Sequence, residues 1–411
     1  MTTAIPTDLQ DERLRADTGL AGAARASLGR IRDGDLGLLP VIAGLIIIWT
    51  IFQILNPVFL SPRNLSDLLM QSAPVGVIAL GIVFVLLVGE IDLSVGSISG
   101  LSAAIFAVQY VNNGLALPLA ILLAVLTGAV IGWVYGQIYN RVGVPSFVIS
   151  LAGLLGFLGL QLYVLGPDGT INIPFDSPLV LLGQLLYVPD WLAYALAAVT
   201  VAVFVVQRVA GARRRRAAGL SAPTIGVIVV QAAILAAVLV AAALYLYQAS
   251  GVGWMFVFFV ALVLVANYAL TRTSWGRAFF AVGGNREAAR RSGIRVRAIY
   301  TSAFIASATL AAVGGLLAAG RLSSAAQSSG AGDVNLNAIA AAVIGGTSLF
   351  GGRGSAFSAL LGILVISSIS SGLTLLNLDS SIRYMVTGAV VLIAVALDAL
   401  ARRSRSSHGR A

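Results

Sequence analysis

The sequence contains no cysteine and no lysine, and it has a single histidine, His408. Without cysteine there is no disulfide, no thiolate metal site and no cysteine nucleophile. Without lysine there is no GK[ST] phosphate loop to hold a nucleotide, and no amine to form a Schiff base. We therefore expect a chain that is not an enzyme, that binds no metal or cofactor of its own, and that does not hydrolyse ATP itself.

Charge is also scarce. Only 10% of the 411 residues are charged, 58% are hydrophobic, and the mean hydropathy is +0.95. This composition lies outside the soluble globular range and is typical of proteins that cross a membrane many times. Asp8, Asp11, Glu12 and Asp17 precede any apolar run, which is not the pattern of a secretory signal, so we expect segment 1–35 to stay cytoplasmic.

Apolar runs long enough to cross the hydrocarbon layer, which takes about 20 residues, recur along the chain. They predict an all-α polytopic transmembrane helical bundle of about twelve spans, with ten as the lower bound. We expect one transmembrane domain, 36–401, between the cytoplasmic segment 1–35 and a cytoplasmic tail, 402–411. The expected spans are 37–58, 68–89, 93–112, 115–139, 145–165, 188–207, 222–248, 252–270, 299–320, 335–350, 355–376 and 382–401.

The distribution of the arginines along the chain supports this membrane topology. With the N-terminus inside, 23 of the 26 arginines fall in cytoplasmic segments, and only Arg63, Arg321 and Arg383 fall outside. This is the asymmetry of the positive-inside rule, and it places both termini in the cytoplasm. The run Arg213 to Arg216 could be a nucleic-acid patch, but beside two spans we interpret it as a topology anchor that touches anionic lipid.

Two segments are too rich in glycine and charge to be plain membrane helices, and we expect broken helices near 89–100 and 344–356. Glu90 and Asp92 lie in the first, where a charge at mid-bilayer would cost about 2.5–3.5 kcal/mol unless it faces protein or water. Asp92 or Ser94 could simply cap the following helix, or could cap it and also line a passage.

The second segment aligns weakly with the first, and paired broken segments are typical of a transporter's central pathway. The candidate pathway residues are Glu90, Asp92, Ser94, Ser97, Asn337, Thr347 and Ser348. Two other sets of glycines recur at helical spacing and predict close helix packing rather than substrate contact. These are Gly128, Gly132 and Gly136, and Gly153, Gly156 and Gly159.

The longest internal cytoplasmic loop, 271–298, carries seven arginines between Arg272 and Arg297. Within it, "NREAARRSGI" contains helix-forming residues that end at Gly293, so it predicts a short surface helix. Such a helix could lie on anionic lipid. Alternatively, its small alanines and its charges could seat it in a cleft of a partner protein.

The pattern Glu287-Ala288-Ala289-x-x-x-Gly293 resembles the loop that permeases of ABC importers insert into their ATPase subunits. The chain resembles, over nearly its whole length, the permeases of bacterial sugar ABC importers, in the group that handles ribose, xylose and related monosaccharides. Four stretches carry this resemblance. They are "GEIDLSVGSISGLSAA" (89–104), "GVPSFVISLAGLLGFLGL" (143–160), "TSWGRAFFAVGGNREAARRSGI" (273–294) and "AAVIGGTSLFGGRGSAFSALLG" (341–362). The "GTI" at 169–171 and the extra hydrophobic pair around the arginine run are most like the xylose-type permeases.

The resemblance implies a homodimer in the bacterial inner membrane, in contact with membrane lipid. It also implies a cytoplasmic subunit that binds ATP–Mg and an extracytoplasmic sugar-binding protein; no nucleic acid is expected. The implied ATPase-coupling residues are Arg286, Glu287, Ala288, Ala289, Gly293 and Ile294. The alternative from another class is an ion-coupled secondary transporter, whose ion would bind at Glu90 and Asp92.

Overall fold

The structure is a computed structural model that describes residues 39–379, 381–382, 385–386, 388–389 and 392. The predicted segment 1–35, the tail 402–411 with His408, and most of the predicted span 382–401 lie outside the described residues.

The helices group into two compact units. The described part of the first, here called the hairpin unit, is Val188–Val252, and it consists of α8 (Asp190–Ala217) and α9 (Ile225–Leu246) packed against each other. The predicted arginine anchor forms the last turns of α8, and the Nε of Arg215 donates to the carbonyl of Ser221 at 2.7 Å.

The described part of the second, here called the main unit, is 39–187 and, with the gaps given above, 253–392, and it holds all the other described helices and strands. Its first half contains α2 (Leu39–Leu55), α3 (Pro62–Leu87), α4 (Val95–Ala107), the π-helical turn η2 (Val108–Asn112), α5 (Leu117–Gln137), the π-helical turn η3 (Ile138–Val142), α6 (Ser146–Leu165), β1 (Thr170–Asn172) and α7 (Pro178–Gln184). Its second half contains α10 (Trp254–Arg272), α11 (Ser274–Gly284), α12 (Arg286–Arg291), α13 (Val296–Leu322), β2 (Ser324–Ala326), α14 (Val334–Ile344) and α15 (Ala356–Leu375).

Nine helices of the described residues are long and apolar enough to cross a membrane. This confirms the prediction of a polytopic helical bundle, and α2 and α14 are shorter apolar helices at two further predicted spans. The predicted span 335–350 is wrong in length, because α14 has only 11 residues. It ends at Ile344, just before Gly346, whose φ of 103° is incompatible with a helix.

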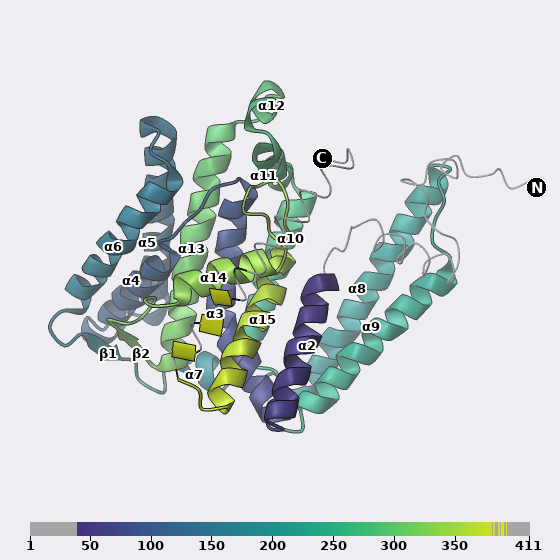
Figure 1. The fold of residues 1–411 in the computed structure, drawn as a ribbon, viewed down its shortest axis with the longest axis horizontal. Coiled ribbons are helices and arrows are strands. Elements are labelled where there is room, and N and C mark those ends of the chain that lie inside the picture. Colours follow the sequence, from purple (N-terminus) through teal and green to yellow (C-terminus); the bar gives the residue numbers. More distant parts are fainter. Residues whose placement is uncertain (1–38, 380, 383–384, 387, 390–391, 393–411) are drawn as a thin grey trace, which may run out of the picture. The chain divides into compact units, whose positions relative to one another are not determined.

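The centre of the main unit is formed by α3 and α13. In α3, 83% of the apolar window is buried, and in α13 67%, whereas α5, α6 and α10 are buried over only 22–28% of theirs. α13 packs against α3, α4 and α5 along its length, as Figure 1 shows. The outer helices therefore supply the apolar surface that a bilayer would cover.

Close packing of α5 against α13 depends on glycine, as predicted. A Cβ added at Gly128 would meet Ala308 and one added at Gly132 would meet Phe304, in both cases at the backbone of α13. The same prediction is wrong for part of α6. Gly156 and Gly159 are exposed, and a Cβ on either would meet nothing within 4 Å, because no described element covers that face.

Both predicted breaks exist, but the first is shorter than expected. α3 ends at Leu87 and α4 begins at Val95, so residues 95–100 are regular helix rather than broken backbone. The second break is the segment between α14 and α15. A small antiparallel pair, in which Ile171 of β1 lies opposite Ala325 of β2, joins the two halves of the main unit.

Candidate coupling site

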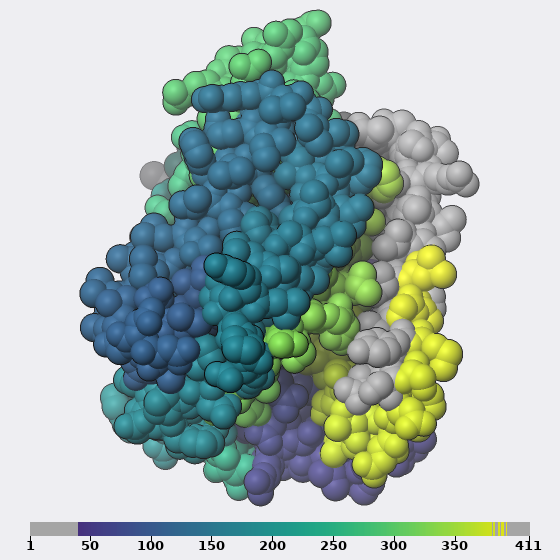
Figure 2. Space-filling model, turned by 90° about the vertical axis from the view of Figure 1, so that its left-hand side faces the viewer, coloured from purple at the N-terminus to yellow at the C-terminus, as the bar shows by residue number. Residues whose placement is uncertain are grey.

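The predicted surface helix exists as α12, and both of its ends are defined by local chemistry. The side chain of Asn285 accepts a hydrogen bond from the backbone N–H of Ala288 at 2.9 Å, which caps the first turn. Gly293 has a φ of 86°, and the N–H of Ile294 returns to the carbonyl of Ala289 at 3.1 Å. This left-handed ending is nearly reserved for glycine. The green segment that contains α12 projects from one end of the main unit (Figure 2).

The predicted coupling residues do not all face outward. Ala289 is 4% exposed and, with Ile294, packs against the core of the main unit. It anchors the helix and is not available to a partner, so only Ala288 of the two alanines can enter another subunit's cleft. The outward residues are Arg286, Glu287, Ala288, Arg290 and Arg291.

The charges on the outer face of α12 are arranged around one carboxylate. Arg290 contacts Glu287 at 2.9 Å, and Arg291 contacts it at 3.2 Å. These hydrogen bonds hold the pKa of Glu287 below its ordinary value, so the carboxylate is ionised at neutral pH. The helix presents a mixed, net-positive surface that suits docking by shape and charge together.

The first residue of α12 is linked to the first broken segment through two aromatic rings. The guanidinium of Arg286 lies 5.3 Å from the ring centre of Tyr300 on α13, which is within cation–π range. That ring lies 4.8 Å from the ring of Tyr139 on η3. The hydroxyl of Tyr139 donates to the carboxylate of Glu90 at 2.5 Å. We call this series, Arg286–Tyr300–Tyr139–Glu90, the relay.

The two broken segments also contact each other, next to the end of α11. The N–H of Gly352 donates to the carbonyl of Leu87 at 2.9 Å. A Cβ at Gly283, near the end of α11, would collide with both the Leu87 carbonyl and the Gly352 nitrogen. A Cβ at Gly351 would meet the backbone of Gly89. We call the meeting of residues 87–89, 283 and 351–352 the glycine junction. Glycine is required at 283, 351 and 352, because a Cβ at each would collide with the backbone of another segment.

The carboxylate of Asp92 is held inside the main unit. Asp92 is 1% exposed, and it accepts hydrogen bonds from the Ser94 N–H at 2.9 Å and from the Ser94 hydroxyl at 2.7 Å. Ser307 of α13 donates to it at 3.3 Å, and Tyr135 donates to the Ser94 hydroxyl at 2.9 Å. Asp92 thus accepts from the N–H of Ser94, the residue before α4, and the Ser94 side chain caps no N–H of that helix. These bonds also tie the first break to α5 and α13.

Most of the other predicted pathway residues are hydrogen-bonded locally, but the buried hydroxyl of Thr347 has no hydrogen-bond partner among the described residues. The hydroxyl of Ser97 donates to the carbonyl of Ser94 at 2.9 Å, and Ser348 accepts from the N–H of Phe350 at 3.2 Å. Thr347 is buried and lies against Gly354. Asn337, on α14, bonds Asp333 at 2.9 Å rather than the junction. That these residues line a pathway remains a prediction.

Sequence reasoning missed two amides that position the segment after β2. Gln161 of α6 is fully buried, and it donates to the carbonyls of Ala326 and Ser329 at 2.9 and 3.0 Å. The carbonyl oxygen of the Asn335 side chain accepts from the N–H of Gly96. A lone amide in the apolar stretch 146–165 was a readable signal for Gln161, because polar groups inside a span are costly and usually have a function.

Comparison with known proteins agrees with this architecture. Residues 64–395 match the family described as "Branched-chain amino acid transport system / permease component". The chain is 34% identical to the xylose transport system permease protein of Escherichia coli K12 over 389 residues, which cover 94% of this chain and 98% of that one. It is 34% identical to the ribose import permease protein of Bacillus subtilis 168, over 89% of this chain and 94% of that one. It is 30% identical to the D-allose transport system permease protein of Escherichia coli K12, over 87% and 90%.

No solved structure matches the chain. The match to the family covers more than half of the chain, and the relatives are similar over nearly their whole length. The chain therefore belongs to the ribose/xylose-type family of ABC transporter permeases.

Proposed function

We propose that this chain forms the translocation pathway of an ATP-driven monosaccharide importer and receives work from a separate ATPase subunit through residues 283–294. The observation that supports this most strongly is the position of α12. It follows immediately after the glycine junction, and the relay joins its first residue to Glu90. A force applied to α12 is thus delivered to both broken segments.

The mechanism is a two-state switch of these segments. ATP binding by the ATPase subunit favours one position of α12, and the glycine junction passes that preference to the end of α3 and to the segment between α14 and α15. A ligand shifts such an equilibrium only by its difference in affinity for the two states. In this mechanism the free energy for the switch comes from ATP binding by the separate ATPase subunit, because this chain has no lysine and so no phosphate loop.

The partners follow from the family and from what the chain lacks. Two copies of the permease form the membrane unit, the cytoplasmic ATPase binds ATP–Mg, and an extracytoplasmic binding protein delivers the sugar. The relatives named for xylose, ribose and D-allose support a monosaccharide, and we propose a pentose such as xylose. The ion-coupled alternative at Glu90 and Asp92 is not favoured, because these relatives are transport-system permeases and Asp92 is used in an internal hydrogen-bond network.

The test is sugar uptake by the permease reconstituted in liposomes with its ATPase and binding protein. We expect Glu287→Arg and Gly293→Val to abolish ATP-dependent uptake. Gly114→Val is a matched control, because Gly114 is also left-handed, with a φ of 63°, and is also surrounded by open space. Normal uptake by both coupling variants, or uptake driven by an ion gradient without the ATPase, would overturn the proposal.

A further inference from the structure

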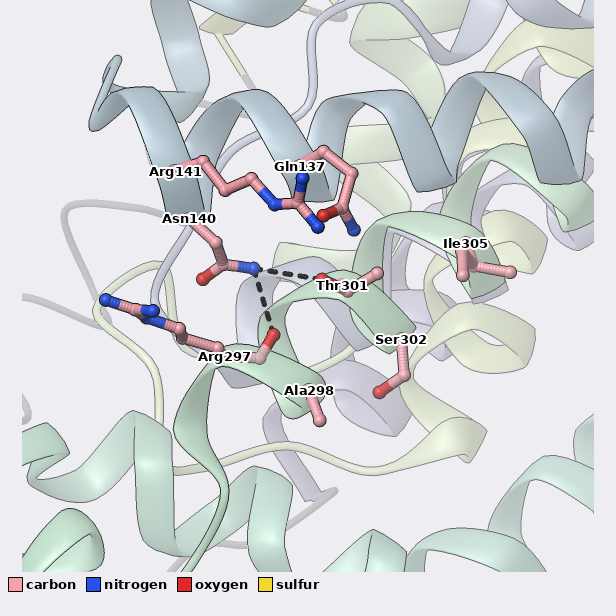
Figure 3. Close-up of a pocket in the computed structure, with 8 residues that line it drawn as sticks. All are labelled: Gln137, Asn140, Arg141, Arg297, Ala298, Thr301, Ser302 and Ile305. Carbon is pink, nitrogen blue, oxygen red and sulfur yellow. Dashed lines mark hydrogen bonds between the residues drawn. The ribbon is translucent and has the colours of Figure 1, made fainter.

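A polar cleft lies between the end of α5 and the start of α13, outside the glycine junction. Its volume is about 430 Å³. Figure 3 shows that its residues come from two sides, with η3 and the end of α5 on one and the first turns of α13 on the other. It is lined by Gln137, Asn140, Arg141, Arg297, Ala298, Thr301, Ser302 and Ile305.

Along each side of the cleft, the side chains change from apolar through neutral polar to cationic toward the end that holds the two arginines. On the α5 side, Trp133, Gln137 and Arg141 follow one another at intervals of four residues and therefore share a face. Trp133 is 52% exposed on the outer apolar surface, Gln137 is a neutral amide, and Arg141 is a cation. This wall runs from an aromatic that suits the membrane interface to a charge that suits the headgroup layer.

The opposite wall repeats that order in the antiparallel helix. Ile305, Thr301 and Arg297 also lie four residues apart on α13, running from apolar through hydroxyl to cation. The two arginines consequently lie at the same end of the cleft. Neither guanidinium forms an ion pair with an acidic side chain in the part of the chain that the structure describes.

The floor of the cleft is fixed in place. The amide of Asn140 donates two hydrogen bonds, one to the Arg297 carbonyl and one to the Thr301 hydroxyl, both at 2.9 Å (Figure 3). Ser302 is held by the indole N–H of Trp275 at 3.0 Å. These bonds join η3 to the first turns of α13, and each of these elements carries one of the two arginines.

We propose that this cleft binds the phosphate of an anionic phospholipid, with its acyl chains along the outer surface of α5. Guanidinium groups match phosphate in charge and geometry, and basic pockets between membrane helices on the cytoplasmic side bind such headgroups. Gln137 and the hydroxyl of Thr301 face the level of the glycerol esters. A lipid fits better than an acidic segment of the ATPase, because the cleft continues onto exposed apolar surface at Trp133, Val130 and Leu126.

The test is native mass spectrometry of the full-length permease in detergent, titrated with phosphatidylglycerol or with phosphatidylcholine of the same acyl chains. We expect the first phosphatidylglycerol to bind at least tenfold more tightly than phosphatidylcholine. Replacing both arginines, Arg141→Gln with Arg297→Gln, should weaken it by roughly thirtyfold, since each basic residue near a lipid surface contributes about fivefold. Lysine at both positions should restore most of the affinity.

The matched control is Arg272→Gln with Arg277→Gln, which removes the same charge from exposed positions outside the cleft and should leave this first lipid bound. Both cleft arginines are exposed, and unchanged thermal unfolding of the variant excludes misfolding as the cause. Equal loss of lipid in the control would overturn the proposal. Competition by millimolar glycerol phosphate as effective as that by the lipid would show a site for free phosphate instead. Retained lipid with lost binding of the ATPase would make the cleft a protein contact and would also overturn it.

Discussion

The backbone N–H of Gly352 lies 2.9 Å from the carbonyl oxygen of Leu87, and this hydrogen bond fastens the second broken segment to the first. The bond joins residues more than 260 positions apart. Gly283 lies so close to its acceptor oxygen and its donor nitrogen that a Cβ at this position would collide with both. A displacement of the end of α11 would consequently move both broken segments.

Gly283 and Gly284 provide a matched pair for testing the junction. A Cβ at Gly283 would collide with backbone atoms of Leu87 and Gly352, whereas one at Gly284 would meet nothing within 4 Å. We expect Gly283→Ala to uncouple the transporter, so that ATP is hydrolysed while sugar uptake falls at least tenfold. Gly284→Ala should retain uptake. Measuring both rates in the same liposomes checks this, and equal uptake by the two variants would contradict a role for the junction.

The relay predicts a specific effect at Tyr139. Tyr139→Phe keeps the ring beside Tyr300 but removes the donor to Glu90. A hydrogen bond to a charged group contributes about 1.5–3 kcal/mol, so we expect sugar moved per ATP to fall while the ATPase still copurifies. Tyr163→Phe is the control, because Tyr163 is 84% exposed. A loss of ATPase binding instead would mean that Tyr139 only supports α12.

Glycines on α5 and α6 should differ in their effect on stability, although their spacing looks alike in the sequence. Gly132→Leu forces a side chain into the backbone of α13 at Phe304 and Ile305, and overpacking of this kind costs about 1–3 kcal/mol. Gly159→Leu adds a side chain on an exposed face and should change the free energy of unfolding by less than about 0.5 kcal/mol. Unfolding in mixed micelles with a rising fraction of SDS measures both. Equal destabilisation would show that the α6 face is also packed, for example in the homodimer.

These glycines illustrate what the sequence can predict and what it cannot. The positions of most long helices follow from apolar runs and from arginine positions, since the bilayer imposes one length and one charge asymmetry. Which face of a helix meets a neighbour is decided by tertiary packing, and spacing alone did not separate Gly132 from Gly159.

The candidate site was predicted in outline for the same reason. α12 could be predicted because its helix-forming residues, its ending at Gly293 and its charges are local features. Arg286, Tyr300, Tyr139 and Glu90 are far apart in the chain and follow no period, so their contact required the structure. Ala289 was assigned to the outer face because a six-residue helix is too short for its apolar side to be evident from periodicity.

Among the polar residues of the outer helices, Gln161 should cause the largest loss in the free energy of unfolding when it is replaced. Its amide donates to the carbonyls of Ala326 and Ser329, and these bonds hold the segment after β2 against α4, where Gly100 leaves room for it. Gln161→Leu retains the volume but leaves these carbonyls unpaired. Since hydrogen bonds inside membrane proteins contribute about 0.6 kcal/mol each on average, we expect a loss of about 1–2 kcal/mol in the free energy of unfolding.

Faster amide hydrogen exchange in Gln161→Leu should be confined to residues 324–333, because only this segment loses its support. The control is Gln109→Leu, because the Gln109 amide bonds the Asn113 side chain on the same surface turn and its replacement should leave exchange in 324–333 unchanged. If the exchange rates of 324–333 were the same in the two variants, the bond between Gly96 and Asn335 would be sufficient to position the segment.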